Sequence, residues 1–324
     1  MSEIVGTTAG YFPRPDYVIE TLKEHEGHQK EGLDPEVERQ LEETFDRGRK
    51  DVIEVQEDAG LELVTEGQLA WDDILAFPAT RIDGIDMKGI IRFYDNNRYY
   101  RRPMVEDELG HSQGLTVDEY EHAVEIADSE AKAVMAGAYS LGDLSDDDYY
   151  GDEDDYLAGF ADVVNAELEA LVDAGAETIQ LDEPSLINAT DDDEIQKAVE
   201  TVERSVEGID ADVIVNTYFG DIADVYPDLL DAVDGIGIDV VAGEENIDAV
   251  NEYGAPESLQ IGCMNSRNTR LESVEELVSS VEDVLDAGSP ETAYVAPSAG
   301  LDFLPWVVME DKVERLGEAT QEVR

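Results

Sequence analysis

Short apolar runs rich in Val and Ile alternate along the chain with longer segments in which apolar positions recur every three to four residues. Runs of the first kind, which break at Gly, Pro or polar residues, predict buried β-strands, and the longer segments predict amphipathic helices. The predicted strands lie at 4–8, 61–65, 132–139, 178–181, 212–216, 235–241, 259–263 and 293–296. The clearest helical segments between them lie at 157–174, 193–206, 222–232, 244–253 and 273–287. Glycines that fit helix C-caps stand near the ends of four of these segments: Gly175, Gly208, Gly254 and Gly288.

The alternation of strands and helices implies that the strands pair in parallel, and eight such units imply closure into a barrel. A (β/α)8 TIM barrel takes about 250 residues plus insertions. We therefore expect the 324 residues to form one α/β domain, 1–324. Two stretches depart from the repeat: residues 9–60, predicted to be an excursion that is helical over 35–59, and residues 76–115, an insertion after the second strand.

The insertion carries the only dense basic cluster of the chain, which runs from Arg92 through Pro103 and is interleaved with aromatic residues. The favoured interpretation is a β-hairpin over the barrel mouth whose arginines pair with nearby carboxylates, because arginine in an acidic protein usually finds structural partners. The alternative is a lid or subunit interface that contacts anions.

Charge changes the picture of the surface. The chain has 80 Asp and Glu against 21 Lys and Arg, a formal net charge of −59, yet 42% of its residues are hydrophobic, which is enough for a sizeable core. A carboxylate-rich surface suits a salt-rich cytosol, where self-repulsion is screened. We interpret the acidity as halophilic adaptation; the alternative is an acidic mesophilic protein that binds cations. Either way, the charge argues against nucleic acid and anionic membranes as partners.

Little in the chain indicates secretion or a metal site. Cys263 is the one cysteine, so no intrachain disulfide can form, and no basic-then-apolar leader or long apolar span is visible. We therefore expect a cytoplasmic protein. His25 and His28 share an HxxH spacing in a predicted surface helix, and no histidine stands at a predicted strand end, where a catalytic zinc would need one. The acidic run 143–155 lacks the spacing of a calcium loop.

Polar residues follow the predicted strands at the positions where a β/α barrel builds its active site. These residues are Glu66 and Gln68 after the second strand, Asp182 and Glu183 after the fourth, Tyr218 after the fifth, Asp239 near the end of the sixth, and Asn265, Arg267 and Asn268 after the seventh.

These residue types suggest several kinds of chemistry. Neighbouring residues on a strand point to opposite faces, so at most one of Asp182 and Glu183 can face the mouth, where it could hold an ammonium group or act as an acid or base. Glu183 is about equally well explained as a helix N-cap. An arginine between amides, such as Arg267, suits a carboxylate or phosphate. Glu66 paired with Asp182 would suit a glycosidase-like hydrolase.

With these residues in place, the chain resembles the cobalamin-independent methionine synthase family. The resemblance runs over nearly the whole chain, from the segment 6–13, GTTAGYFP, to the segment 296–301, APSAGL. Members of this family carry two related barrels, of which the carboxy-terminal one binds zinc and homocysteine and the amino-terminal one has lost the metal and helps to form the folate cleft. A lone barrel also occurs. The segments 217–220, TYFG, and 262–270 are closer to the amino-terminal barrel.

The resemblance implies a zinc cofactor whose ligands are largely missing here. Tyr218 stands within the segment where the catalytic barrel has its His-x-Cys pair, Asp239 lies near the glutamate ligand, and Ala299 replaces the second cysteine. Gln68 stands where a glutamate would grip the homocysteine amino group, whereas Asp182, the other partner of that group, is retained. No residue of this chain is therefore assigned as a metal ligand.

Two functions follow from the resemblance. The first is methyl transfer from a methyl-folate or related one-carbon donor to homocysteine in methionine biosynthesis. In that case Asp182 and the turn at Gly10 and Tyr11 would bind the amino acid, and Arg267 and Asn268 would orient the donor. The arginine patch 98–102 would contact an acidic donor tail. The second is a non-catalytic, metal-free partner subunit of a separate zinc-bearing barrel. The carboxylate-based hydrolase is a third, least supported hypothesis.

Overall fold

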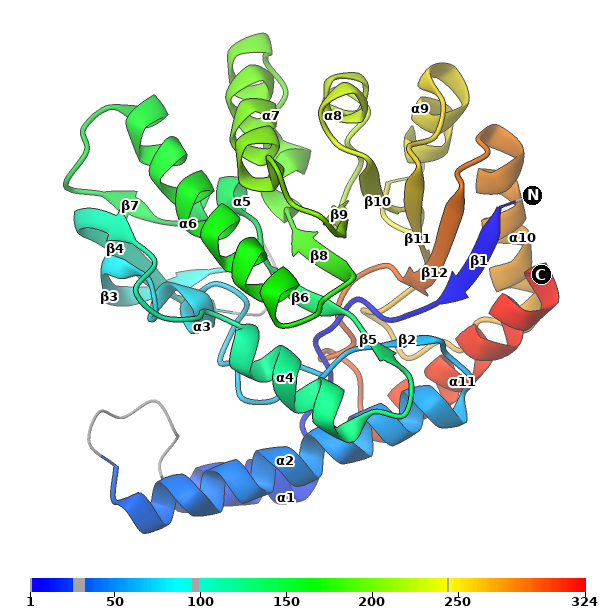
Figure 1. Ribbon diagram of the computed structural model, residues 1–324. Helices are drawn as coiled ribbons and strands as arrows, with labels where there is room; N and C mark the ends of the chain where they lie inside the picture. The colour runs from blue at the N-terminus through cyan, green and yellow to red at the C-terminus, as the bar shows by residue number, and fades with distance from the viewer. Residues whose placement is uncertain (1, 26–32, 95–98, 244) are drawn as a thin grey trace.

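Parallel strands form a curved sheet at the centre of the molecule (Figure 1). The computed structural model describes residues 2–25, 33–94, 99–243 and 245–324. Seven strands form one sheet in the order β1-β12-β11-β10-β9-β8-β6. Their bounds are Glu3–Gly6 for β1, Ala133–Ala136 for β6, Thr178–Asp182 for β8, Asp212–Asn216 for β9, Gly235–Asp239 for β10, Ser258–Met264 for β11 and Thr292–Pro297 for β12.

The eighth strand, β2 (Leu63–Val64), lies between the two edges of this sheet. Leu63 forms an isolated parallel bridge with Thr7, directly after β1. β2 also pairs in parallel with β5 (Glu130–Ala131), which is followed closely by β6, so the ring of strands closes as the TIM-barrel prediction expected.

A side chain completes the short strand. Gln56 on the long helix α2 is fully buried; its Nε2 donates to the Thr65 carbonyl at 2.8 Å, and its Oε1 accepts from the Thr65 amide at 3.0 Å. The Thr8 hydroxyl also donates to Gln56 Oε1 at 2.9 Å. Gln56 therefore gives Thr65 the two hydrogen bonds that a neighbouring strand would otherwise supply.

Replacing Gln56 with Leu should lower the free energy of unfolding by about 3 kcal/mol, because it leaves the buried amide and carbonyl of Thr65 without these partners. The measurement is denaturant-induced unfolding in concentrated KCl. Gln40→Leu, at an exposed position of the same helix, is the matched control and should change the midpoint little. Equal effects of the two substitutions would contradict the role given to Gln56.

Helices surround the strands and follow the predicted alternation (Figure 1). Their bounds are Asp16–Glu24 for α1, Pro35–Asp58 for α2, Ala76–Ala79 for α3, Val117–Ile126 for α4, Ala138–Asp143 for α5, Glu153–Asp173 for α6, Asp192–Val206 for α7, Tyr226–Ala232 for α8, Glu245–Tyr253 for α9, Val274–Ala287 for α10 and Trp306–Val323 for α11, with a 3-10 helix η1 at Pro184–Asn188. The two ends of the chain meet, since Arg324 Nε donates to the Ile4 carbonyl at 3.1 Å.

Local sequence explains where several helices begin. Asp34 accepts from the Glu36 amide ahead of α2, whose first residue is proline, and Asp191 accepts from two amides of α7. Ser273 and Glu276 form a reciprocal capping box at the start of α10. Acidic side chains at helix N-termini also interact favourably with the helix dipole, so part of the negative charge stabilises the fold directly.

Two boundary predictions were wrong in part. The third predicted strand, 132–139, ends at Ala136, because Gly137 is the N-cap of α5 and the chain turns there. The helix predicted at 222–232 begins only at Tyr226, after a turn in which Ile222 O accepts from two amides.

The four predicted C-cap glycines fall into two classes. Gly175, Gly208 and Gly254 have φ of +98°, +77° and +99°, in the left-handed region that such caps use. Gly288 is extended, with φ of −147°, so it is not a left-handed cap. A side chain is excluded at this position for a steric reason, because a Cβ there would lie 2.6 Å from Val250 Cγ1.

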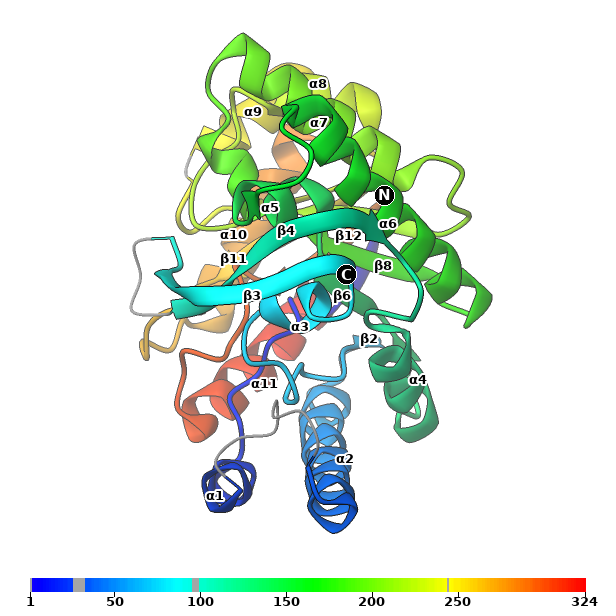
Figure 2. The same ribbon diagram turned by 90° about the vertical axis from the view of Figure 1, so that its left-hand side faces the viewer.

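The insertion after β2 is a β-hairpin, as predicted. β3 (Asp83–Arg92) pairs antiparallel with β4 (Tyr99–Gly110), and β7 (Asp146–Asp147) adds to β4 in parallel. Figure 2 shows the two long strands crossing in front of the barrel strands. Arg102 forms an ion pair with Asp146, which fits the interpretation that arginines here have structural partners. Arg98 lies outside the described residues.

No helix within the described ranges has both the length and the apolar composition that crossing a membrane requires.

Candidate active site

A small pocket opens where the carboxyl ends of the barrel strands meet the hairpin. Aromatic and small apolar residues dominate its walls, with Asp182 as a buried carboxylate among them. Its walls come from the turn after β1, the ends of β8 and β9, the loop after β12 and the hairpin: Ala9, Tyr11, Asp182, Tyr218, Phe219, Ala299, Gly300, Asp302, Phe303, Phe93, Tyr99 and Tyr100, with Asp73 and Ile74. Such a pocket suits a small ligand that is largely apolar and carries one cationic group.

Asp182 is the last residue of β8 and is 4% exposed. Its Oδ1 accepts from Gln180 Nε2 at 2.7 Å and from Asn216 Nδ2 at 2.8 Å. Burial raises the pKa of the Asp182 carboxyl to about 7, although these two hydrogen bonds and the charge of Lys132 oppose the rise. A carboxyl with this pKa can be ionised near neutral pH and can then pair with an ammonium group.

Beneath Asp182 a buried lysine joins the same hydrogen-bond network. Lys132 Nζ donates to Gln180 Oε1 at 2.8 Å and to Gln260 Oε1 at 2.9 Å. Gln260 Nε2 in turn donates to Asn216 Oδ1 at 2.9 Å, which closes the ring back to Asp182. Our sequence analysis missed Lys132, Gln180, Asn216 and Gln260 as members of the site. The available signal was a polar residue inside or next to each of four apolar runs.

Aromatic side chains form the wall beside Asp182. Tyr218 is 5% exposed, and its ring meets Phe219 edge-on with centroids 4.6 Å apart. Phe219 has φ of +76°, an uncommon conformation for a non-glycine residue. The guanidinium of Arg267 lies over the Phe219 ring, 4.5 Å from its centroid. Arg267 and Phe219 therefore present a flat cationic and aromatic edge next to the pocket.

Asp239 fixes this strained turn rather than facing the pocket. Its Oδ2 accepts from the Phe219 amide at 3.0 Å, and its Oδ1 accepts from the Val241 and Ala242 amides, each at 2.8 Å. Burial raises the pKa of the Asp239 carboxyl, against the opposing effect of these amides. Both oxygens of Asp239 are thus occupied by backbone donors.

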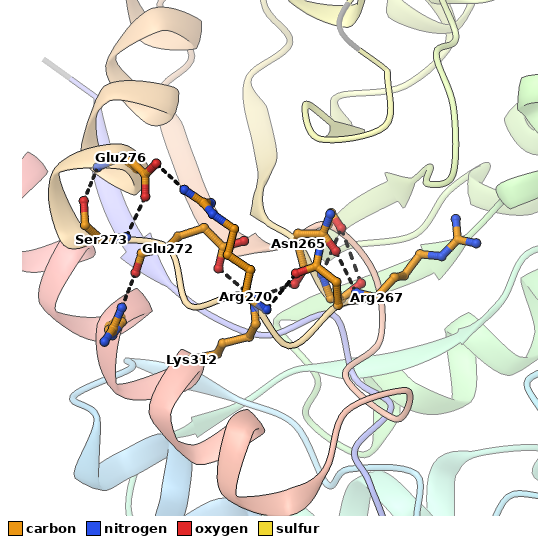
Figure 3. A network of polar contacts seen from close by, with 11 residues as sticks. Asn265, Arg267, Arg270, Glu272, Ser273, Glu276 and Lys312 are labelled. Atoms are coloured by element: carbon orange, nitrogen blue, oxygen red, sulfur yellow. Dashed lines mark hydrogen bonds and ion pairs between the residues drawn. The ribbon is translucent and has the colours of Figure 1, made fainter.

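The loop after β11 is held in place from below (Figure 3). Lys312 on α11 is fully buried, and its Nζ donates to the Asn265 carbonyl at 2.8 Å and to Glu272 Oε2 at 2.6 Å. Within the loop, Asn265 Oδ1 accepts from the Arg267 amide at 2.9 Å, and the Asn268 side chain likewise accepts from the Arg270 amide at 3.0 Å. In Figure 3 the Arg267 side chain extends away from this network.

Glu183 lies on the other side of the strand from the pocket. Its two oxygens accept from the Tyr139 amide at 2.9 Å and from the Ser140 amide at 2.7 Å, at the start of α5. Gly137 gives it room, since a Cβ there would lie 2.1 Å from Glu183 Oε1. Glu183 stands at the N-cap position of η1 but makes no side-chain cap hydrogen bond there; its carboxylate instead caps α5. Burial raises the pKa of the Glu183 carboxyl to about 7.

Glu66 and Gln68 line a different cavity, next to α4. Glu66 Oε1 accepts from the Gln68 amide at 2.6 Å, and Glu66 Oε2 lies 3.5 Å from Arg49 Nε; burial raises the pKa of the Glu66 carboxyl to about 8. Gln68 has φ of +55°, and within the described residues neither polar atom of its buried amide has a hydrogen-bond partner. Gly10, with φ of +100°, lies against it: a Cβ there would be 2.9 Å from Gln68 Oε1.

The residues at the positions of the family's zinc ligands do not fit zinc. Asp239 has no free oxygen, and Tyr218 and Ala299 offer no soft ligand. The Cys263 thiol points to the Ala296 carbonyl at 3.6 Å, and burial raises its pKa to about 12, so it would not be a thiolate. No three His, Cys, Asp or Glu side chains converge as a metal site within the described residues, which do not include His28.

Comparison with known proteins gives the family. The sequence pattern described as cobalamin-independent synthase, N-terminal domain, matches residues 83–288, more than half of the chain. The methionine synthase of Sulfurisphaera tokodaii is 29% identical over 320 residues, which cover 98% of this chain and 92% of that protein. The methionine synthase of Saccharolobus solfataricus is 27% identical over 321 residues, 98% of this chain and 94% of that protein.

Solved structures agree on the fold. A B12-independent methionine synthase from Shewanella sp. W3-18-1, in complex with selenomethionine, aligns with a TM-score of 0.86 at 18% identity over 100% of this chain and 98% of that one. A vitamin-B12-independent methionine synthase described as putative, from Listeria monocytogenes, aligns with a TM-score of 0.78 at 14% identity, covering 100% and 99%. By its fold and by the match of more than half of its sequence, this chain belongs to the cobalamin-independent methionine synthase family, with its match to the amino-terminal domain.

Proposed function

We propose that this chain binds homocysteine at the mouth of its barrel and takes part in methyl transfer to the homocysteine sulfur, with a separate zinc-bearing barrel activating the thiol. The observation that carries the proposal is a buried carboxylate, Asp182, in the wall of a largely aromatic pocket that Asp73 and Asp302 also line, in a chain of this family. A carboxylate in such a place favours an ammonium group, and the apolar walls suit a thioether or thiol side chain.

Each part of the amino acid has a candidate partner. The ammonium group would pair with Asp182, and the carboxylate would approach the turn that contains Gly10 and Tyr11, which lies against the pocket. Arg267 and Asn268, exposed at the neighbouring loop, would orient the methyl donor. The donor is a methyl-folate or a related one-carbon carrier, whose flat ring would suit the edge formed by Phe219 and Arg267.

The step itself requires a thiolate. The sulfur lone pair attacks the methyl carbon, the bond from that carbon to the donor nitrogen breaks, and its electron pair stays on the nitrogen, which takes up a proton. A free thiol has a pKa of about 8.5, and zinc in this family lowers it. Because the corresponding residues of this chain do not fit zinc, we assign thiol activation to a second barrel.

This half-enzyme proposal predicts that the chain and a zinc-bearing barrel of the same organism act together. In concentrated KCl, with L-homocysteine and methyl-folate, the mixture should form methionine at least about tenfold faster than the sum of the two separate proteins. The measurement is methionine formed over time.

Two results would contradict it. Methionine formation by this chain alone would make it an autonomous methyltransferase. If L-homocysteine does not bind and the mixture shows no gain, neither function derived from the family holds. The carboxylate hydrolase has no support in the geometry, since Glu66 lines another cavity and pairs with Arg49.

A further inference from the structure

In the ring of hydrogen bonds beneath the pocket, donors and acceptors follow one another in a fixed order from Lys132 to Asp182. The members of the ring come from the three strands β8, β9 and β11 and from the residue before β6: Lys132, Gln180, Asp182, Asn216 and Gln260. An amide side chain has a donor end and an acceptor end, so it can be inserted in either orientation. A protonated lysine has only donors, and an ionised carboxylate has only acceptors. These two residues therefore decide how the three amides between them must point.

Two arms of the ring lead from Lys132 to Asp182: a short arm through Gln180 and a long arm through Gln260 and Asn216. Lys132 donates into both arms and so sets their orientation. It is 2% exposed, and its Nζ donates to the side-chain oxygens of Gln180 and Gln260, so each glutamine must turn its nitrogen away from the lysine. In the short arm, that nitrogen of Gln180 donates directly to Asp182 Oδ1 at 2.7 Å and also to the Ala9 carbonyl at 3.2 Å, a second acceptor that favours the same orientation.

The long arm contains a second amide side chain, that of Asn216, whose orientation is fixed by Gln260. Gln260 Nε2 donates to Asn216 Oδ1, which forces Asn216 to present its nitrogen to Asp182. Gly237 leaves room for this placement, because a Cβ there would lie 2.4 Å from Asn216 Oδ1. Both arms thus begin on the donor-only Lys132 and end as two donors on one oxygen, Asp182 Oδ1.

We propose that Lys132 is a positioning residue for ammonium recognition: it orients the amides of Gln180, Gln260 and Asn216 so that two donors converge on Asp182 and keep that carboxylate ionised toward the pocket. The choice of homocysteine as the ammonium-bearing ligand rests on the proposed function, but the action of Lys132 on Asp182 does not.

The charges around the pair are consistent with this role. Burial lowers the pKa of Lys132 to about 7, while the charges of Asp182 and Asp212 oppose that decrease. The charge of Lys132 in turn lowers the pKa of Asp182, which burial raises. The charge of Asp182 also raises the pKa of Tyr218 and that of Glu183, although burial is the larger cause for each. Lys132 is the cation that acts on the Asp182 carboxyl within the described residues.

The first test needs no ligand. The titration of the Asp182 carboxyl is followed by carbon NMR of protein labelled at aspartate, with the signal identified by its loss in Asp182→Asn. In Lys132→Met the midpoint should rise by about one pH unit or more, because the charge is lost and the amides of Gln260 and Asn216 no longer have a fixed direction. Lys132→Arg, which keeps a donor-only cation, should bring the midpoint back toward that of the wild type.

Two further variants separate this effect from general damage. Gln260→Met breaks only the long arm and should give a smaller rise in the midpoint. Lys312→Met removes a second buried lysine, which lies on α11, and should leave the Asp182 titration unchanged. If Lys132→Met does not fold, Gln260→Met carries the test. An Asp182 midpoint that is the same in wild type and in these ring variants would overturn the proposal.

The second test uses L-homocysteine and 4-mercaptobutyrate, which lacks the amino group. By calorimetry at pH 7, Lys132→Met should weaken binding of L-homocysteine by about tenfold or more and change binding of 4-mercaptobutyrate little. Equal losses for both ligands would contradict a role in ammonium recognition. If the wild type binds neither compound, the proposed function fails, whereas the carboxyl titration still decides the role of Lys132.

Discussion

Asp182→Asn should weaken the binding of L-homocysteine by about two orders of magnitude, the loss expected when one partner of a buried, hydrogen-bonded charge pair is removed. The substitution preserves size but removes the charge. Because Gln180 and Asn216 both donate to Oδ1, the amide oxygen of Asn can accept both hydrogen bonds, so the substitution chiefly tests the charge. Binding is measured by calorimetry in concentrated KCl, with unfolding curves to show that the variant is folded.

The pH dependence supplies a second signature of the same charge pair. Burial raises the pKa of Asp182 to about 7, so the wild type should lose affinity for L-homocysteine as the pH falls below about 7, where the carboxyl becomes protonated. Asp182→Asn should bind weakly with little pH dependence over this range. Asp162→Asn, at an exposed position on α6, is the control and should bind as the wild type does. Retained affinity in Asp182→Asn would exclude Asp182 as the ammonium partner.

Lowering the KCl concentration from about 2 M to about 0.05 M should decrease the midpoint of thermal unfolding by about 10 °C or more. The formal charge is −59, and the Debye length grows from about 3 Å at 1 M to well over 10 Å as salt is removed. The repulsion among carboxylates then acts across the whole surface. Successive exposed acidic residues in the first turns of helices, such as Asp192, Asp193 and Glu194 in α7, repel one another most strongly when salt is removed.

The control for this prediction is a neutral osmolyte. NaCl should replace KCl at equal concentration, whereas sucrose, which is excluded from the protein surface but does not screen charge, should restore the midpoint at low salt much less than salt does. A midpoint that is independent of salt would remove the halophilic interpretation. It would leave the acidic surface to be explained by the alternative of cation binding.

The strand ends were predictable because the barrel places one apolar run after another in the same orientation. Asp182 could be identified on that basis, since it follows a buried run and is succeeded within two residues by Pro184, which begins the 3-10 helix η1. The hairpin was predictable from its break in the strand and helix alternation. Which of Asp182 and Glu183 faces the pocket was not, because alternation along a strand fixes opposite faces but not their assignment.

The ring beneath Asp182 could not be derived from local pattern. Gln180 and Gln260 stand inside apolar runs and Lys132 at the edge of one, where a single polar residue does not interrupt a strand prediction. Their role becomes visible only in the fold, where parallel strands bring residues distant in sequence, such as Lys132 and Gln260, into hydrogen-bond contact. The same limit applies to Gln56, a helix residue whose partner belongs to a strand.

The pairing of Gln56 with Thr65 helps to close the ring of strands at β2. The ring of strands is joined at β2 by a strand of two residues and one side-chain amide, whereas the seven other strands are joined by continuous parallel pairing. Paired strands separate one residue at a time, whereas the amide side chain of Gln56 leaves Thr65 by rotation about single bonds. Closure of the ring at β2 therefore depends on one buried side chain of α2, whereas the seven-stranded sheet that carries Asp182 is held by the pairing of its own strands.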